Sequence, residues 1–240
     1  MGLPLQGACS GHVTSTPLPL CLSGPSRSPP VDMSKRLIQN LAKAISKNVV
    51  HFNKMEVECL IREFHSLLGQ PNSAGKSDNL DERRFKGILK NDFGLTNDTI
   101  MERVFRSFDK DSDGCISVKE WVEGLCVFLR GSLDEKIRYC FRVYDLSGDE
   151  HISREEMLLM TRNCLRLHGE EDPFDGIKDL VEITLKRMDH DNDDRLSFDD
   201  YEKSVKEFNI VLEAFGTCLP NALRIEEFEQ RVFQEKSDQR

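Results

Sequence analysis

The 240-residue sequence contains no run of eighteen apolar residues, so it predicts no membrane-spanning helix. It also contains no HExxH motif, no glycine-rich phosphate loop and no nucleophile motif, and we therefore expect no enzymatic activity. Basic residues are too few for a general nucleic-acid binder, because 33 lysines and arginines face 42 acids and give a net charge of −9. Eight cysteines occur without a CxxC pair, which favours a reduced, intracellular protein.

Proline, serine and glycine dominate the first 32 residues, and Pro17 and Pro19 interrupt their leucine cluster. A secretory signal needs an unbroken apolar core, which this segment lacks. The N-myristoylation motif requires Ser or Thr where this chain has Gln6. We therefore predict that residues 1–32 form a disordered N-terminal extension.

The stretch FDKDSDGCISVKEW places three carboxylates on alternate residues, where they repel one another unless a cation lies between them. A twelve-residue EF-hand loop supplies Ca²⁺ with oxygens from positions 1, 3, 5, 7, 9 and 12. Those positions are Asp109, Asp111, Asp113, the carbonyl of Cys115, Ser117 and Glu120. Gly114 stands at position 6, where the chain turns sharply with a positive φ. The alternative is a solvated acidic turn.

Two further loops repeat these offsets. The repeated positions are Asp145, Ser147, Asp149, Ser153 and Glu156 in one loop, and Asp189, Asp191, Asp193, Ser197 and Asp200 in the other. Apolar residues flank every loop at helical spacing, which predicts a helix on each side. The two loops are either calcium sites or structural relics that stay empty at cellular calcium.

Three substitutions weaken the match in these two loops. Glu150 and Asp194 occupy position 6 in place of glycine. A left-handed residue other than glycine costs about 1 kcal/mol, which corresponds to roughly tenfold weaker binding at loop 145–156. Asp200 at position 12 is shorter than glutamate and favours magnesium or weaker calcium binding. We therefore predict that loop 109–120 is the tightest site.

EF-hands pair, so three hands predict a fourth. Residues 73–84, SAGKSDNLDERR, keep an apolar Leu80 at position 8 but have Arg84 at position 12. We predict a degenerate first EF-hand there, with an ordinary helix–loop–helix as the alternative. The expected fold is all-α, with an N-terminal EF lobe at 33–130, a C-terminal EF lobe at 131–218 and a C-terminal helix or tail at 219–240.

Two segments outside the loops have amphipathic patterns. Residues 34–54 carry five cations and no acid, with a stripe formed by Leu37, Leu41, Ile45 and Val49. This segment either packs on the first lobe or binds a membrane surface or an acidic partner. A second apolar face contains Ile225, Phe228, Val232 and Phe233. It either caps the groove of the second lobe or packs as core.

One silent and three complete hands resemble the neuronal-calcium-sensor and calcineurin-B-like group, and within it the EF-hand sensors of ciliary outer-arm dynein. The resemblance covers most of residues 34–220, and its most specific stretches are EEDPFDGIKDLVEITLKRMDHDNDDRLSFDDYE and LEAFGTCLP. It implies calcium binding, with magnesium at rest. Its pattern assigns ligand roles to Asp109, Asp111, Asp113, Cys115, Glu120, Asp145, Ser147, Asp149, His151, Glu156, Asp189, Asp191, Asp193, Arg195 and Asp200.

The same resemblance implies contact with the outer-arm dynein heavy chain and docking-complex proteins, near the doublet microtubules. It implies a place in the cytoplasm and cytoskeleton, in the axoneme of cilia and flagella, and a role in regulating their motility. Composition and spacing alone leave two other functions open. One is an EF-hand regulatory subunit of a phosphatase or kinase, and the other is a plain cytosolic calcium buffer.

Overall fold

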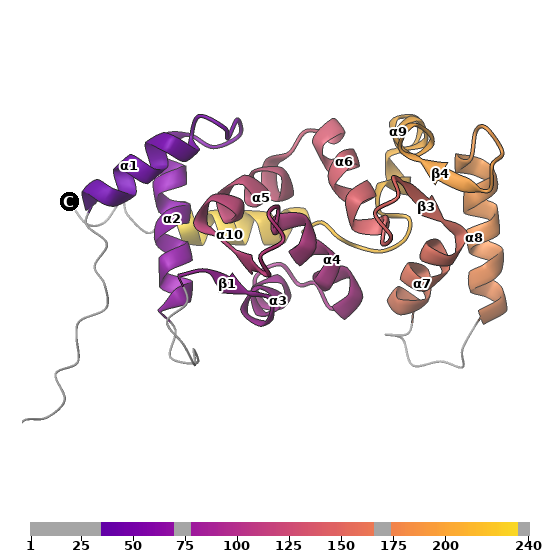
Figure 1. The fold of residues 1–240 in the computed structure, drawn as a ribbon, viewed down its shortest axis with the longest axis horizontal. Coiled ribbons are helices and arrows are strands. Elements are labelled where there is room, and N and C mark those ends of the chain that lie inside the picture. Colours follow the sequence, from indigo (N-terminus) through magenta and orange to yellow (C-terminus); the bar gives the residue numbers. More distant parts are fainter. Residues whose placement is uncertain (1–34, 70–77, 166–173, 235–240) are drawn as a thin grey trace, which may run out of the picture. The chain divides into compact units, whose positions relative to one another are not determined.

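The computed structural model describes residues 35–69, 78–165 and 174–234 (Figure 1). Its elements are α1 (Lys35–Ile45), α2 (Lys54–Leu68), β1 (Leu80–Asp81), α3 (Glu82–Asn91), α4 (Asp98–Phe108), β2 (Cys115–Ile116), α5 (Val118–Arg130), α6 (Leu133–Tyr144), β3 (His151–Ser153), α7 (Arg154–Leu165), α8 (Phe174–Met188), β4 (Arg195–Ser197), α9 (Phe198–Glu207), the 3₁₀ helix η2 (Asn209–Glu213) and α10 (Ala222–Gln234). The all-α prediction is confirmed. The predicted disordered extension at 1–32 lies outside the described residues, as do residues 73–77 of the degenerate loop.

Two antiparallel strand pairs join the four EF-hands. In the N-terminal pair of hands (α2 to α5), β1 pairs with β2 and Leu80 lies opposite Ile116. In the C-terminal pair (α6 to α9), β3 pairs with β4 and Ile152 lies opposite Leu196. All four of these position-8 side chains are fully buried. The pairing of Leu80 confirms that a degenerate first hand packs against loop 109–120.

The helices begin at residues whose side chains cap them. Asn53, Ser117, Ser132 and Ser197 each accept a hydrogen bond from the backbone three residues later, and an acid at that later position bonds back to the cap. This reciprocal arrangement is a capping box, and it satisfies backbone N–H groups that a helix start leaves free. At Ser117 and Ser197 the partner acid is the position-12 carboxylate of a loop. One side chain therefore both starts the exiting helix and faces the loop.

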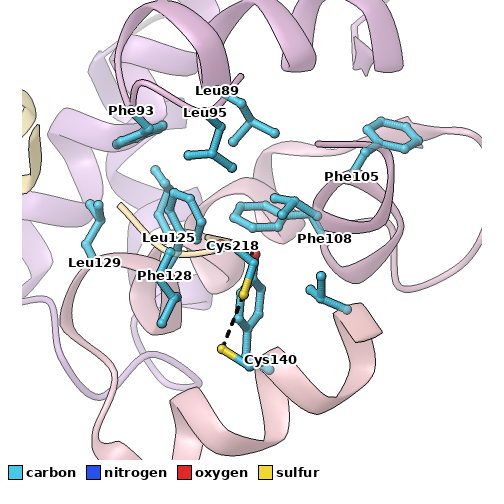
Figure 2. Close-up of a cluster of buried hydrophobic side chains, with 14 of the residues drawn as sticks. Leu89, Phe93, Leu95, Phe105, Phe108, Leu125, Phe128, Leu129, Cys140 and Cys218 are labelled. Carbon is cyan, nitrogen blue, oxygen red and sulfur yellow. Dashed lines mark hydrogen bonds between the residues drawn. The ribbon is translucent and has the colours of Figure 1, made fainter. Parts of the chain in front are cut away.

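Aromatic rings fill the core of the N-terminal pair. The ring of Phe85 lies 4.9 Å from that of Phe108, and Phe93 packs edge-on to Phe128 at 5.1 Å. Figure 2 shows Phe108 and Phe128 below Leu89 and Phe93, and the two rings pack edge-on at 5.7 Å. These contacts come from several helices, so each apolar stripe predicted around loop 109–120 buries its face in one shared core.

The basic N-terminal segment packs on the first lobe. Helix α1 ends at Ile45, well before the end of the predicted amphipathic stretch at residue 54. It buries Ile38, Ala42 and Ile45, whereas Leu37 is 53% exposed. Ile45 and Val49 of the predicted stripe are buried and Leu41 is partly buried against the core, so only Leu37 departs from the prediction.

The C-terminal helix packs on the N-terminal pair, so the predicted cap on the second lobe's groove is wrong. Helix α10 contacts α2 and runs at a steep angle to it in Figure 1. Its buried Phe228 stacks near Phe93, with ring centroids 5.0 Å apart. Arg130 at the end of α5 pairs with Glu229 at 2.7 Å and with Glu56 at 2.9 Å. These contacts attach the end of the chain to the N-terminal pair.

The LEAFGTCLP segment contacts helix α6. The Glu213 carboxylate accepts hydrogen bonds from the backbone N–H of Cys218 and of Leu219, at 2.8 and 2.9 Å. The Cys218 thiol lies 3.3 Å from the Cys140 thiol on α6, and Figure 2 shows this pair next to the aromatic cluster. Gly216 has φ +140°, and a Cβ there would lie 2.4 Å from the Cys164 sulfur. Only glycine fits this close approach.

Candidate metal-binding loops

Loop 109–120 holds its acids in place with backbone N–H groups. Asp109 and Glu120, at the two ends of the loop, are only 7% and 6% exposed. Glu120 accepts from the N–H of Lys110 at 2.8 Å and of Ser117 at 2.9 Å, and Asp109 accepts from Gly114 at 3.0 Å. One oxygen each of Asp109, Asp111 and Glu120 lie within 4.8 Å of one another. Hard oxygen donors at this spacing suit a divalent cation such as Ca²⁺.

The pKa values of two acids in this loop, Glu120 and Asp111, are shifted in opposite directions. Burial would raise the pKa of Glu120, but hydrogen bonds from Ser117, Lys110 and Asp111 lower it on balance. The pKa of Asp111 is raised by desolvation and by the charges of Glu120, Asp113 and Asp109. Glu120 is thus a preformed anion. Asp111 is the acid that would gain most from a cation nearby.

Loop 145–156 repeats the arrangement. Asp145 and Glu156 are buried at its ends. Glu156 accepts from the N–H of Ser147 at 2.8 Å and of Ser153 at 2.7 Å. Hydrogen bonds from the backbone of His151 and the side chain of Ser147 lower the pKa of Asp149. Among the described residues, however, no three acids of this loop lie within 4.8 Å of one another, unlike those of loops 109–120 and 189–200.

Loop 189–200 differs at position 12. Asp200 is buried and accepts from the N–H of His190 and of Ser197, both at 3.2 Å. Among the described residues, the three acids within 4.8 Å here are Asp189, Asp191 and Asp193. Asp200 is not in that group, whereas Glu120 belongs to the group of its own loop. The shorter aspartate side chain accounts for this difference.

The position-7 residues share one contact in all three loops. The N–H groups of Cys115, His151 and Arg195 donate to the position-5 aspartates at 2.7, 3.1 and 2.9 Å. Each of these residues also begins a short strand. The strand and the hydrogen bond fix the backbone at the position whose carbonyl an EF-hand offers to the metal.

Two positions in every loop have left-handed backbone, and the sequence analysis considered only one of them. Position 6 has φ +80° at Gly114, +67° at Glu150 and +64° at Asp194. Position 4 has φ +59° at Ser112, +75° at Gly148 and +59° at Asn192. The first two loops thus each carry one glycine and one strained residue. Glycine or asparagine at position 4 was the available signal, since both tolerate this conformation.

Arg103 is a further residue that loop spacing does not reveal. It lies on α4, and its guanidinium donates to the carbonyls of Val143 and Leu146 at 3.3 Å and also to that of Asp145. The end of α6 leaves these carbonyls without helical partners. One arginine of the N-terminal pair therefore contacts the backbone at the start of loop 145–156.

Four hands in two strand-linked pairs, with hard oxygen donors in three loops, define a calcium-binding sensor of the EF-hand class. The profile described as an EF-hand domain pair matches residues 134–206, and an EF-hand profile matches residues 100–125. No helix in the described ranges is long and apolar enough to cross a membrane.

Comparison with known proteins narrows the class. Calaxin from Xenopus laevis is 55% identical over 207 residues, which cover 86% of this chain and 100% of the relative. Human calaxin is 53% identical over 207 residues, with 86% and 98% coverage. The chain belongs to the calaxin family. Calcineurin B from Candida glabrata is a more distant relative, 27% identical over 157 residues, which cover 65% of this chain and 83% of the relative.

Proposed function

We propose that this chain is a calcium sensor that binds axonemal outer-arm dynein and its docking complex and regulates ciliary and flagellar motility with calcium. The observation that carries this is the coincidence of three acid-lined loops with family membership over the full length of a calaxin. The partners follow from the resemblance described above. The proposed location is the cytoplasm and the axonemal cytoskeleton, and we propose no catalytic role.

The ligand set of each loop is also a proposal. In the first loop it is Asp109, Asp111, Asp113, the Cys115 carbonyl and Glu120. For the other two loops we propose the ligands that the sequence analysis assigned to them. A bound Ca²⁺ would supply two positive charges that neutralise the loop, and Mg²⁺ would take the same centre at rest. Loop 189–200 suits Mg²⁺ best, because Asp200 lies outside its group of three neighbouring acids.

The capping boxes favour a sensor over a plain buffer. Glu120 accepts from Ser117 at the start of α5, and Asp200 accepts from Ser197 at the start of α9. A position-12 carboxylate that turns toward a cation therefore pulls on the first turn of a helix. Arg103 of the N-terminal pair donates to the carbonyl of Asp145, so a movement of loop 145–156 would also be transmitted to helix α4.

We further propose that residues 33–130 and 131–218 are the two working lobes and that the 219–240 tail belongs functionally with the first. Support comes from α10, which buries Phe228 against Phe93 in the N-terminal pair. Release of this helix would expose the apolar surface it covers. That surface is then available to a partner when the tail moves.

A pull-down from axoneme extract tests the proposed partners. The immobilised protein is exposed to extract in excess calcium and in chelator, and the captured proteins are identified by mass spectrometry. A Glu120→Gln/Glu156→Gln variant is the matched control, because glutamine can still accept from the backbone N–H of Ser117 and of Ser153 but removes two ligand charges. We expect dynein heavy chain or docking-complex proteins, with a calcium dependence that the variant loses. Capture of a phosphatase or kinase catalytic subunit alone would replace this proposal with a regulatory-subunit function.

A further inference from the structure

A groove on the C-terminal pair lies beside loop 145–156 and is partly lined by Asp145, Glu150 and His151 of that loop. It encloses about 720 Å³ and is lined by residues of α6, of the loop and of the start of α9. This volume falls in the usual range of ligand pockets, about 300–1,000 Å³. Phe141 and Phe198 line it and pack edge-to-face at 5.4 Å. Phe141 is buried, so the half-buried Phe198 supplies the apolar surface that a side chain of a partner would meet.

Two arginines stand along the groove. Arg138 and Arg142 lie one turn apart on α6, and both side chains are exposed. Within the described ranges neither forms an ion pair, although Arg142 Nε donates to the Arg138 carbonyl at 3.3 Å. Arginine pairs of this kind bind carboxylates in fixed geometry. In a chain with a net charge of −9, they form a local site for anions.

Three carboxylates offset these arginines. Asp145, Glu150 and Asp199 also line the groove, so with His151 counted as neutral the lining charge is +2 − 3 = −1. Asp145 is at the same time a proposed ligand of loop 145–156. Asp149 and Glu156, the other proposed carboxylate ligands of the loop, add two more negative charges beside the groove. Metal loading therefore makes the charge that a partner meets at the groove less negative by two, without reversing its sign.

We propose that this groove binds an acidic segment of a partner protein, with an apolar side chain against Phe198 and carboxylates on Arg138 and Arg142, and that metal in loop 145–156 strengthens this binding by adding two positive charges beside the groove. The inference rests on the proposed metal binding of that loop. It differs from lobe opening, because both arginines are already exposed and Phe198 is half-buried. Charge complementarity of this kind controls both the rate and the specificity of association.

A labelled heptapeptide that alternates glutamate with leucine is the probe, and its glutamine–leucine counterpart is the control for charge. Fluorescence anisotropy measures the affinity of the full chain for each peptide in calcium and in chelator. Exposed ion pairs contribute less than tenfold each, so we expect the acidic peptide to bind about fivefold more tightly in calcium. The glutamine peptide should show little preference, and added salt should weaken only the acidic peptide.

Three variants localise the effect. Arg138→Ala/Arg142→Ala should abolish the calcium preference, whereas Lys186→Ala/Arg187→Ala removes two exposed charges of α8 and should leave it intact. Glu150→Gln/Asp199→Asn removes two negative charges from the lining, which is the same change in charge that a bound divalent cation makes. That variant should bind the acidic peptide in chelator as tightly as the unaltered chain binds it in calcium.

The possible results distinguish failure of the groove proposal from failure of the proposed metal binding of loop 145–156. Calorimetry on the same samples records calcium binding directly. Normal calcium binding with equal affinity for both peptides, or an unchanged preference after loss of both arginines, overturns the groove proposal alone. Absence of calcium binding at loop 145–156 would instead remove the metal loading on which both rest.

Discussion

Exchanging the two left-handed positions of loop 145–156 tests how its backbone is built. Gly148 at position 4 has φ +75°, and a Cβ there would meet nothing within 4 Å. Gly148→Ala therefore adds only backbone strain, which costs about 1 kcal/mol. Glu150 at φ +67° already carries such strain, so Glu150→Gly should recover about 1 kcal/mol. The double variant should return close to the unaltered protein.

The free energy of unfolding in saturating calcium is the quantity to measure, by denaturant titration. The chain's three tyrosines, Tyr139, Tyr144 and Tyr201, lie on α6 and α9, so their signal reports the C-terminal pair. Gly176→Ala in α8 of the same pair is the matched control, because its Cβ also meets nothing but its backbone is helical. It should stabilise by about 0.5–1 kcal/mol. If Gly148→Ala left the free energy of unfolding unchanged, or if Glu150→Gly lowered it, then backbone strain at these two positions would not be the cause.

Three other predictions concern position 12, the tail and pH. Asp200→Glu lengthens the position-12 acid and should shift loop 189–200 from magnesium toward calcium, measured by calcium titration in magnesium; unchanged selectivity would show that length is not the limit. Phe228→Ala should lower the free energy of unfolding by about 3–5 kcal/mol, measured by denaturant titration, because Phe228 is buried, while Leu223→Ala on the same helix should have little effect because Leu223 is 63% exposed. Equal losses would place α10 elsewhere. Burial and the neighbouring Cys218 charge raise the pKa of Cys140, and burial likewise raises that of Tyr144. The folded protein favours their protonated forms, so this stabilisation is complete below about pH 8.5 and is lost as pH rises above it; a melting temperature that stays flat to about pH 10 would contradict this.

The sequence predicts the hands well because an EF loop is local. Its ligand offsets, the apolar position 8 and the flanking helical stripes all lie within about thirty residues. The degenerate first hand was found because Leu80 keeps its place opposite Ile116. Each of these signals is a spacing along the chain, and the strand pairs then follow from it.

Contacts between residues far apart in the sequence could not be predicted from these spacing patterns. The apolar face of α10 predicts that the helix is buried but not which lobe it contacts, since Phe228 fits any aromatic core. The contact with Phe93 joins residues 135 apart in the sequence, and no spacing encodes it. The reach of Arg103 to the end of α6 is likewise a tertiary contact. The strain at position 4 was missed for a different reason, because EF-hand patterns place glycine only at position 6.

Calorimetric titration of calcium into the chain and into its Glu120→Gln variant tests the central claim that these loops form a graded calcium sensor. Glutamine keeps the capping box with Ser117, so the variant should fold like the unaltered chain. We predict that the tightest binding phase disappears while weaker phases from the other loops remain. An equally tight phase in the variant, or no calcium binding by the unaltered chain, would contradict the claim.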